Sequence, residues 1–133
     1  MASRRHARRL AVDILYQADL TGTDPARVLA TWADAERERP PFTIELCEGV
    51  AEHGSEIDLL LEEHAEEWSV ARMASLDRTI LRLAVFELLH RPDVPTSVAI
   101  SEAVQAAAEL STEDSSRFVN GILGRIAREI AAG

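Results

Sequence analysis

Apolar residues recur along this chain every three or four positions, the spacing that places them on one face of an α-helix. The first such segment runs from about Ser3 to Leu20, and Arg4, Arg5, Arg8 and Asp19 fall outside its apolar stripe. The segment from Ser75 to Leu89 is apolar on nearly every side, which predicts a central helix. No segment shows a clear two-residue alternation typical of a half-buried strand. The pattern therefore predicts an all-α protein of about seven helices.

Glycine, proline and small polar residues divide the chain at the ends of these segments. Gly22 can end the first helix, and Asp24 with Pro25 can begin the second. Residues 39–41 (Arg-Pro-Pro) break the chain, and residues 53–56 interrupt the helix that follows. The residues expected to cap later helices are Ser55, Thr96 or Ser97, and Ser111 or Thr112. We expect one domain, residues 1–133, with two packed helical sub-bundles of about 1–70 and 71–133.

Size and composition agree with a single folded domain. The chain has 133 residues, of which 47% are hydrophobic, so it can bury a core without disulfides or metal. No apolar run approaches the roughly 20 residues that a membrane span requires. The basic N-terminus is not followed by the uninterrupted apolar run of a secretory signal. We expect a cytoplasmic protein with no membrane partner.

The charge is distributed unevenly. The formal net charge is −9, yet residues 1–12 contain Arg4, Arg5, Arg8 and Arg9 and no acidic residue. A polyanion would be repelled by most of the molecule and attracted to this end, which favours a nucleic-acid contact. The alternative is a chance cluster of arginines on a solvated helix. Basic residues near a helix N-terminus are disfavoured by the helix dipole, and this favours the functional interpretation.

Catalytic and cofactor motifs are missing from the sequence. It has no glycine-rich phosphate loop, and neither His6, His53, His64 nor His90 pairs with another histidine or with Cys47 at metal-ligand spacing. Cys47 lies on an apolar helix face, where a core role is favoured over a nucleophilic one. We therefore expect no enzyme activity, no cofactor and no metal.

Four sequence blocks resemble the NusB family of bacterial transcription antitermination proteins. They occur in the family's order and span almost the whole chain. The blocks are Arg4 to Val12 with Leu15-Tyr16-Gln17, Asp77 to Ala84 with Glu87-Leu88, Val94-Pro95 with Val98 to Val104, and Asp114 to Leu123.

The resemblance implies an all-helical fold of two bundles and a role in transcription. NusB proteins bind the boxA element of ribosomal RNA transcripts together with NusE, and the assembly helps RNA polymerase read through terminators. The residues that match the family's RNA surface are Arg4, Arg5 and Arg8, followed by Arg9, Tyr16 and Phe118. Core roles for Tyr16 and Phe118 stay open. Asp77 matches a position near the NusE surface, and a helix-start role is its alternative.

Two other functional hypotheses stay open. The chain could be a protein-interaction module that contacts NusE or itself, with weak RNA affinity when alone. A homodimer could then cover the arginine helix. A helical domain acting in ribosomal RNA modification would need a separate catalytic chain.

We also expect Gly121, inside the last helix, to permit close helix packing.

Overall fold

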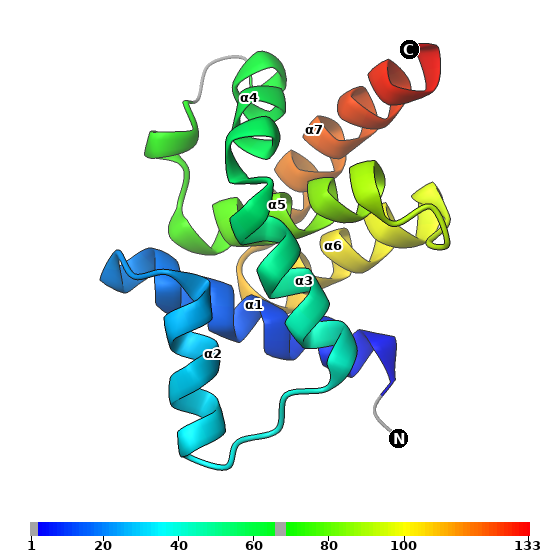
Figure 1. The fold of residues 1–133 in the computed structure, drawn as a ribbon. Coiled ribbons are helices and arrows are strands. Elements are labelled where there is room, and N and C mark those ends of the chain that lie inside the picture. The colour runs from blue at the N-terminus through cyan, green and yellow to red at the C-terminus, as the bar shows by residue number, and fades with distance from the viewer. Residues whose placement is uncertain (1–2, 66–68) are drawn as a thin grey trace.

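The computed structural model describes residues 3–65 and 69–133, and these ranges form seven α-helices and one 3₁₀ turn (Figure 1). The elements are α1 (Arg4–Thr21), α2 (Pro25–Asp34), α3 (Pro41–Glu52), α4 (Gly54–His64), η1 (Val70–Arg72), α5 (Ser75–His90), α6 (Thr96–Leu110) and α7 (Glu113–Ala132). No strand occurs in the described ranges, which confirms the all-α prediction. Three residues of the sequence predictions lie outside the described residues. They are Trp68, which we expected to continue the apolar pattern, and Glu66 and Glu67, which we expected in an acidic patch.

The helix boundaries at the start of the chain are fixed by the predicted residues. The Ser3 hydroxyl accepts a hydrogen bond from the His6 amide at 3.1 Å, and Gly22 ends α1 in a left-handed conformation with φ of 67°. The Asp24 carboxylate then accepts a hydrogen bond from the Ala26 amide at 2.9 Å. Near the other end of the chain, the Thr112 hydroxyl caps α7. The end of α1 at Gly22 and the side-chain caps at Asp24 and Thr112 were correctly predicted, whereas the cap at Ser3 was not among the predictions.

Two other caps were wrongly predicted. α4 begins at Gly54 without a side-chain cap, because His53 both ends α3 and begins α4. The His53 carbonyl accepts from the Ile57 amide at 3.0 Å, so the backbone satisfies the helix start. α6 begins at Thr96 in the same way, with the Pro95 carbonyl accepting from the next turn. Ser55 and the Thr96 and Ser97 pair therefore have no capping role.

α5 is the central helix of the molecule, as its apolar sequence predicted. It contacts α1, α3, α4, α6 and α7, and Figure 1 shows it passing through the middle of the fold. Its fully buried residues join those of the other helices in one core. α4, which we expected with the first sub-bundle, packs against both α5 and α7. The division into two sub-bundles stays a prediction. No helix among the described residues is long and apolar enough to cross a membrane.

A close contact between α3 and α5 depends on a glycine that was not among the sequence predictions. A Cβ atom added to Gly49 of α3 would lie 2.2 Å from the Phe86 ring of α5. α3 and α5 therefore approach closely only because Gly49 has no side chain. A Cβ at Gly121 would meet only the Arg125 side chain, at 3.6 Å. The expectation of close packing at Gly121 is wrong.

Candidate nucleic-acid interface

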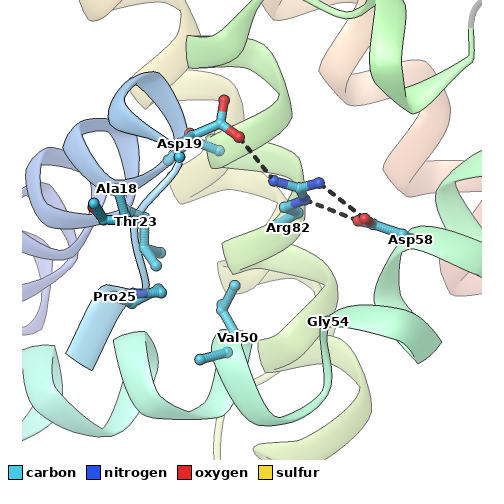
Figure 2. Close-up of a pocket in the computed structure, with 12 residues that line it drawn as sticks. Ala18, Asp19, Thr23, Pro25, Val50, Gly54, Asp58 and Arg82 are labelled. Atoms are coloured by element: carbon cyan, nitrogen blue, oxygen red, sulfur yellow. Dashed lines mark hydrogen bonds and ion pairs between the residues drawn. The ribbon is translucent and has the colours of Figure 1, made fainter. Parts of the chain in front are cut away.

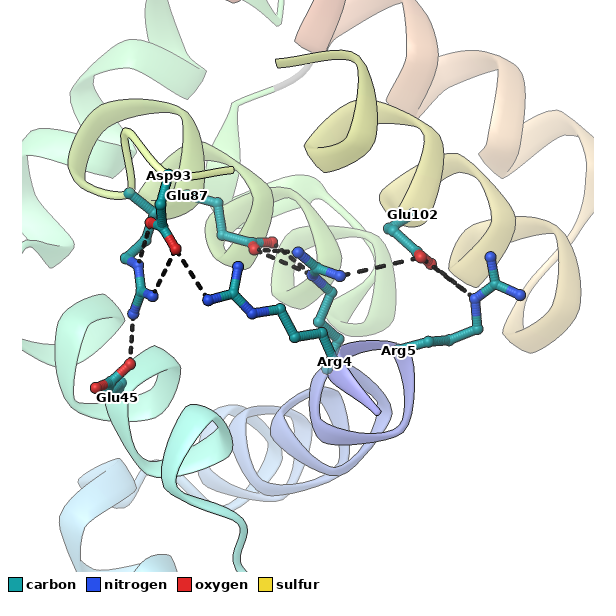
Figure 3. Close-up of polar contacts among 8 residues, drawn as sticks. Arg4, Arg5, Glu45, Glu87, Asp93 and Glu102 are labelled. Atoms are coloured by element: carbon teal, nitrogen blue, oxygen red, sulfur yellow. Dashed lines mark hydrogen bonds and ion pairs between the residues drawn. The ribbon is translucent and has the colours of Figure 1, made fainter. Parts of the chain in front are cut away.

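Three arginine side chains lie on the accessible side of the first two turns of α1. Arg4 and Arg5 have exposed side chains and Arg9 is partly exposed. Each donates to a carboxylate from another part of the chain. Figure 3 shows the contacts of Arg4 and Arg5. Arg4 donates to Asp93 at 2.9 Å, Arg5 to Glu102 at 3.2 Å, and Arg9 to Glu109 at 2.9 Å.

These contacts align α1 with α6. Arg5 meets Glu102 in the middle of α6, and Arg9, one turn further along α1, meets Glu109 in the last turn of α6. The arginine row therefore leads toward the 111–112 connection and the start of α7. Because Arg4, Arg5 and Arg9 already have carboxylate partners, a phosphate bound here would have to replace or share them.

Arg8 has a different environment from its neighbours. Its guanidinium donates to both carboxylate oxygens of Glu87 on α5, at 2.8–3.1 Å. The side chains are only 8% and 1% exposed, and Glu102 lies 3.9 Å away on the other side of Arg8. The expectation that Arg8 lies off the buried face of its helix is wrong, since α1 packs against both α3 and α5. A signal was present in the sequence: Glu87 is a charged residue within the apolar stretch from Leu83 to Leu89 of this helix.

Asp93, in the α5–α6 connection, holds Arg4 in a second network. Arg91 donates to both oxygens of Asp93, at 3.0 and 3.1 Å, and also to Glu45 of α3 (Figure 3). The hydrogen bonds from Arg91 and then Arg4 hold the pKa of Asp93 well below its usual range. The same contacts, to Asp93 and then Glu45, raise the pKa of Arg91. Asp93 is thus a carboxylate in a position to mimic a phosphate between two guanidinium groups.

The ring of Phe42 lies close to three guanidinium groups at this end of the molecule. The centre of the Phe42 ring lies 4.5 Å from the Arg4 guanidinium carbon, 5.0 Å from that of Arg91 and 5.3 Å from that of Arg8. Such distances are typical of cation–π contacts. Phe42 comes from the first turn of α3, directly after the predicted proline break. The proline-containing connection before α3 therefore places the Phe42 ring beside the start of α1.

The two aromatic residues predicted to contact RNA are both half-buried. Tyr16 lies on α1 seven residues beyond Arg9, hence near the same helix face. Phe118 lies on α7 and lines a groove of about 480 Å³ with Asp77, Asp114, Ser115 and residues 72–74. Both residues are partly accessible, so the RNA-contact predictions stay open together with the core alternatives.

Asp77 lies in the first turn of α5 and faces this groove. One carboxylate oxygen accepts a hydrogen bond from Ser115 at 3.1 Å. The other oxygen is buried and has no hydrogen-bond partner among the described residues. The N-cap of α5 is Ala74, so Asp77 is not its capping residue. A buried carboxylate oxygen without a donor is costly.

A separate cavity of about 300 Å³ lies at the other end of α1, among α1, α2, α3, α4 and α5 (Figure 2). Arg82 crosses its wall, donating to Asp58 at 2.8 Å and to Asp19 at 3.2 Å. Asp19 also accepts from Arg78 at 2.7 Å. Burial tends to raise the pKa of Asp19, but the hydrogen bond and charge of Arg78 outweigh it, and the pKa is lowered. The charges of this network balance, and it joins α1 to α4 and α5.

Cys47 lies in the core, and two of the four histidines contact each other. Cys47 is fully buried, and burial raises the pKa of its thiol to about 12, which confirms a core role. His53 and His90 are 37 positions apart in sequence, yet their rings stack with centroids 3.8 Å apart. The sequence has no histidine pair at metal-ligand spacing, and it could not reveal this pair because sequence spacing does not detect a contact between distant segments.

Comparisons with known proteins place the chain in a family. The family model of NusB matches residues 5–128. The transcription antitermination protein NusB of Saccharopolyspora erythraea is 51% identical, and the match covers 96% of this chain and 88% of the relative. That of Beutenbergia cavernae is 50% identical over 96% of this chain and 91% of the relative. The chain belongs to the NusB family. Membership confirms both the predicted resemblance and a non-enzymatic role.

Solved structures of NusB proteins share this fold. Thermotoga maritima NusB is 36% identical and superposes with a TM-score of 0.86, over 96% of this chain and 92% of that one. A chain from the complex of antitermination factors NusB and NusE with double-stranded RNA is 26% identical, with a TM-score of 0.83 over 95% and 96% of the two chains. The NusB fold thus accounts for nearly every described residue.

Proposed function

We propose that this chain binds boxA RNA of ribosomal RNA transcripts together with NusE, and so promotes read-through by RNA polymerase. The observation that carries the proposal is the row of Arg4, Arg5 and Arg9 on one side of α1, in a molecule of net charge −9. The NusB–NusE–RNA complex of a relative supports both partners. Binding to a nascent transcript implies a cytoplasmic protein.

The four arginines of α1 have two proposed roles: three contact phosphates, and one fixes the position of the helix. Arg4, Arg5 and Arg9 present guanidinium forks to phosphates, a geometry that favours two parallel hydrogen bonds. Arg8 acts through its neighbours, since its ion pair with Glu87 fixes α1 against α5. Tyr16 and Phe118 offer ring faces on which unstacked bases can pack, as in many single-stranded RNA sites.

NusE is proposed to contact the surface around Asp77. Asp77 lines the groove, and the negative charge of its carboxylate favours a basic group of the partner there. The groove beside it is also lined by Met73 and Ala74, which can receive an apolar side chain. The negative surface of this chain suits a basic ribosomal protein, because opposite potentials speed and orient association.

The test is fluorescence anisotropy with a short boxA RNA and a scrambled RNA, with and without NusE. We expect tighter binding to boxA, improved further by NusE. Three phosphate contacts would give the logarithm of affinity a slope of about −2 against the logarithm of salt concentration, at about −0.7 per contact. Arg4→Ala with Arg5→Ala should reduce that slope to about −0.7 and leave NusE binding intact.

The matched control for this pair is Arg128→Ala, an exposed arginine near the end of α7. Figure 1 separates the end of α7 from the start of α1, so this variant should bind RNA as the wild type does. Equal, weak binding to both RNAs in the presence of NusE would contradict the boxA assignment.

The alternative is a protein-interaction module that contacts NusE or itself and binds RNA weakly when alone. The observation that favours it is that every arginine of the row already has a carboxylate partner. Sedimentation of the free chain separates the two forms of this alternative. A dimer that dissociates when RNA is added would indicate that the arginine helix is covered by self-association.

A further inference from the structure

Three potential metal ligands converge where the α3–α4 junction meets the end of α5. The His90 Nε2 atom lies 2.7 Å from an oxygen of Glu56, and the His53 Nδ1 atom lies 3.7 Å from the same oxygen. One ligand atom of each residue lies within 4.8 Å of the other two. The cluster belongs to neither the arginine row nor the Asp77 groove.

The backbone fixes the positions of the two histidines. His53 is the shared residue of two helices: its amide donates to the Gly49 carbonyl at 2.9 Å, and its carbonyl accepts from Ile57 at 3.0 Å. His90 is the last residue of α5. Both backbone positions are therefore held by helix hydrogen bonds, so only the side chains would have to turn for both imidazoles to face one ion.

An apolar ring supports the histidine pair from within the protein. Phe86 lies one turn before His90 on α5, and its ring centroid is 5.6 Å from that of His90 and 6.0 Å from that of His53. Phe86 is itself held against Gly49, where no side chain other than hydrogen fits. Both imidazoles are half-buried, with 31% of each side chain exposed. Their rotamer freedom is therefore already restricted.

We propose that His53, Glu56 and His90 bind one divalent transition-metal ion of the Zn²⁺ type. Two imidazole nitrogens and a carboxylate are a common three-ligand set for zinc, with a fourth position left to water or another ligand. Glu52 lies 3.9 Å from the other nitrogen of His53 and can orient that ring as an outer-shell partner. The ion would join the α3–α4 junction to the end of α5.

A second imidazole distinguishes this cluster from an ordinary surface ion pair. His6 and Glu38 are also 2.7 Å apart, but that pair is not part of a three-ligand cluster among the described residues. Glu63, His64 and Glu129 form another cluster with only one nitrogen ligand. Since imidazole binds Zn²⁺, Ni²⁺ and Cu²⁺ better than carboxylate alone does, the His53 cluster should have the higher affinity.

The test is a competition titration of the tag-free chain with Zn²⁺ and a chromogenic chelator. We expect one tight ion per chain, and an affinity order of Co²⁺ < Ni²⁺ < Cu²⁺ with Cu²⁺ above Zn²⁺. His53→Ala, His90→Ala and Glu56→Gln should each weaken Zn²⁺ binding by about tenfold or more, since loss of an outer-shell partner alone costs that much. Glu56 is exposed, so its variant keeps the fold even if a histidine variant does not.

The matched control is His6→Ala, which removes a histidine from a His–Glu pair of the same length and should leave Zn²⁺ binding unchanged. The visible spectrum of bound Co²⁺ should change in Glu56→Gln and not in His6→Ala. Failure of the wild-type chain to compete with the chelator would overturn the proposal. So would Zn²⁺ binding that survives all three ligand substitutions, or that disappears only with His64→Gln.

Discussion

Adjacent arginines at the start of α1 have opposite roles. Arg8 is buried in an ion pair with Glu87, while Arg9 reaches an accessible carboxylate at the end of α6. One helix position turns a side chain by about 100° around the axis, and here that rotation separates core from surface. The identity of a residue therefore does not determine its role in this motif. The partner that tertiary packing brings to it does.

Arg8→Ala should destabilise the protein rather than only weaken RNA binding. Removing one member of a buried ion pair leaves an uncompensated charge, here Glu87, and typically costs about 3–5 kcal/mol. The change in unfolding free energy is measured by urea denaturation. Arg8→Met together with Glu87→Leu should restore most of the stability. If Arg8→Ala keeps full stability and loses only RNA affinity, Arg8 is a direct RNA contact after all.

Asp93→Asn and Glu102→Gln should each strengthen RNA binding. Both carboxylates hold arginines of the proposed phosphate surface, so they compete with the ligand. Arg4, Arg5 and Asp93 are exposed, although Glu102 is only 14% exposed, and ion pairs of exposed groups are weak, so we expect a gain of roughly two- to fivefold in affinity at low salt. Fluorescence anisotropy measures it. Asp34→Asn, which removes the same charge from the end of α2, should give no gain; an equal gain would mean that only net charge matters.

At the scale of the helices, the sequence predicted the number and order of elements because each helix carries its own apolar period. Caps were correctly predicted only where a side chain supplies the hydrogen bond, as Asp24 and Thr112 do. At the start of α4 and α6 a backbone carbonyl takes that role, and no residue type signals it. Gly49 was missed for the same reason, since its importance depends on which ring lies opposite.

Substituting the two helical glycines tests this explanation of packing. Gly49→Ala places a methyl group inside the contact distance of Phe86, and overpacking of this kind costs about 1–3 kcal/mol. Gly121→Ala meets only a movable arginine side chain and should be neutral or stabilise α7 by up to about 1 kcal/mol. Thermal unfolding of both variants measures the difference. Equal effects would contradict the close α3–α5 approach.

At the scale of the whole molecule, the candidate sites are assembled from residues that are distant in sequence. Arg5 and Glu102, Arg8 and Glu87, and His53 and His90 all meet across helices. The sequence located the arginine cluster, because local charge is visible without a fold. It could not reveal the carboxylates opposite, or the histidine pair, because both depend on how α5 and α6 pack. The resemblance to NusB indicated which residues match the family's RNA surface, but it did not indicate these contacts between helices.

The Asp19 network should make stability depend on acid pH. The pKa of Asp19 is lowered from its ordinary value of 3.8 in the folded state. Its contribution is therefore fully present above that value and is lost as the pH falls through the lower folded pKa. Asp19→Asn should destabilise the protein at pH 7, and the difference from wild type should shrink near pH 3. Urea unfolding at several pH values measures this, with Asp13→Asn on the exposed side of α1 as control. A difference that stays constant with pH would contradict the assignment.

The Phe42 ring has a consequence for how the arginine row responds to a ligand. A free arginine loses much of its rotational entropy when it is held in one geometry, at about 0.5–1.5 kcal/mol for each immobilised side chain. Stacking on Phe42 has already confined Arg4 and its neighbour Arg91 in the unbound protein. Association at this surface should therefore have a smaller unfavourable entropy than binding by a disordered basic tail of the same charge. A residue that touches no phosphate would then determine part of the affinity for RNA.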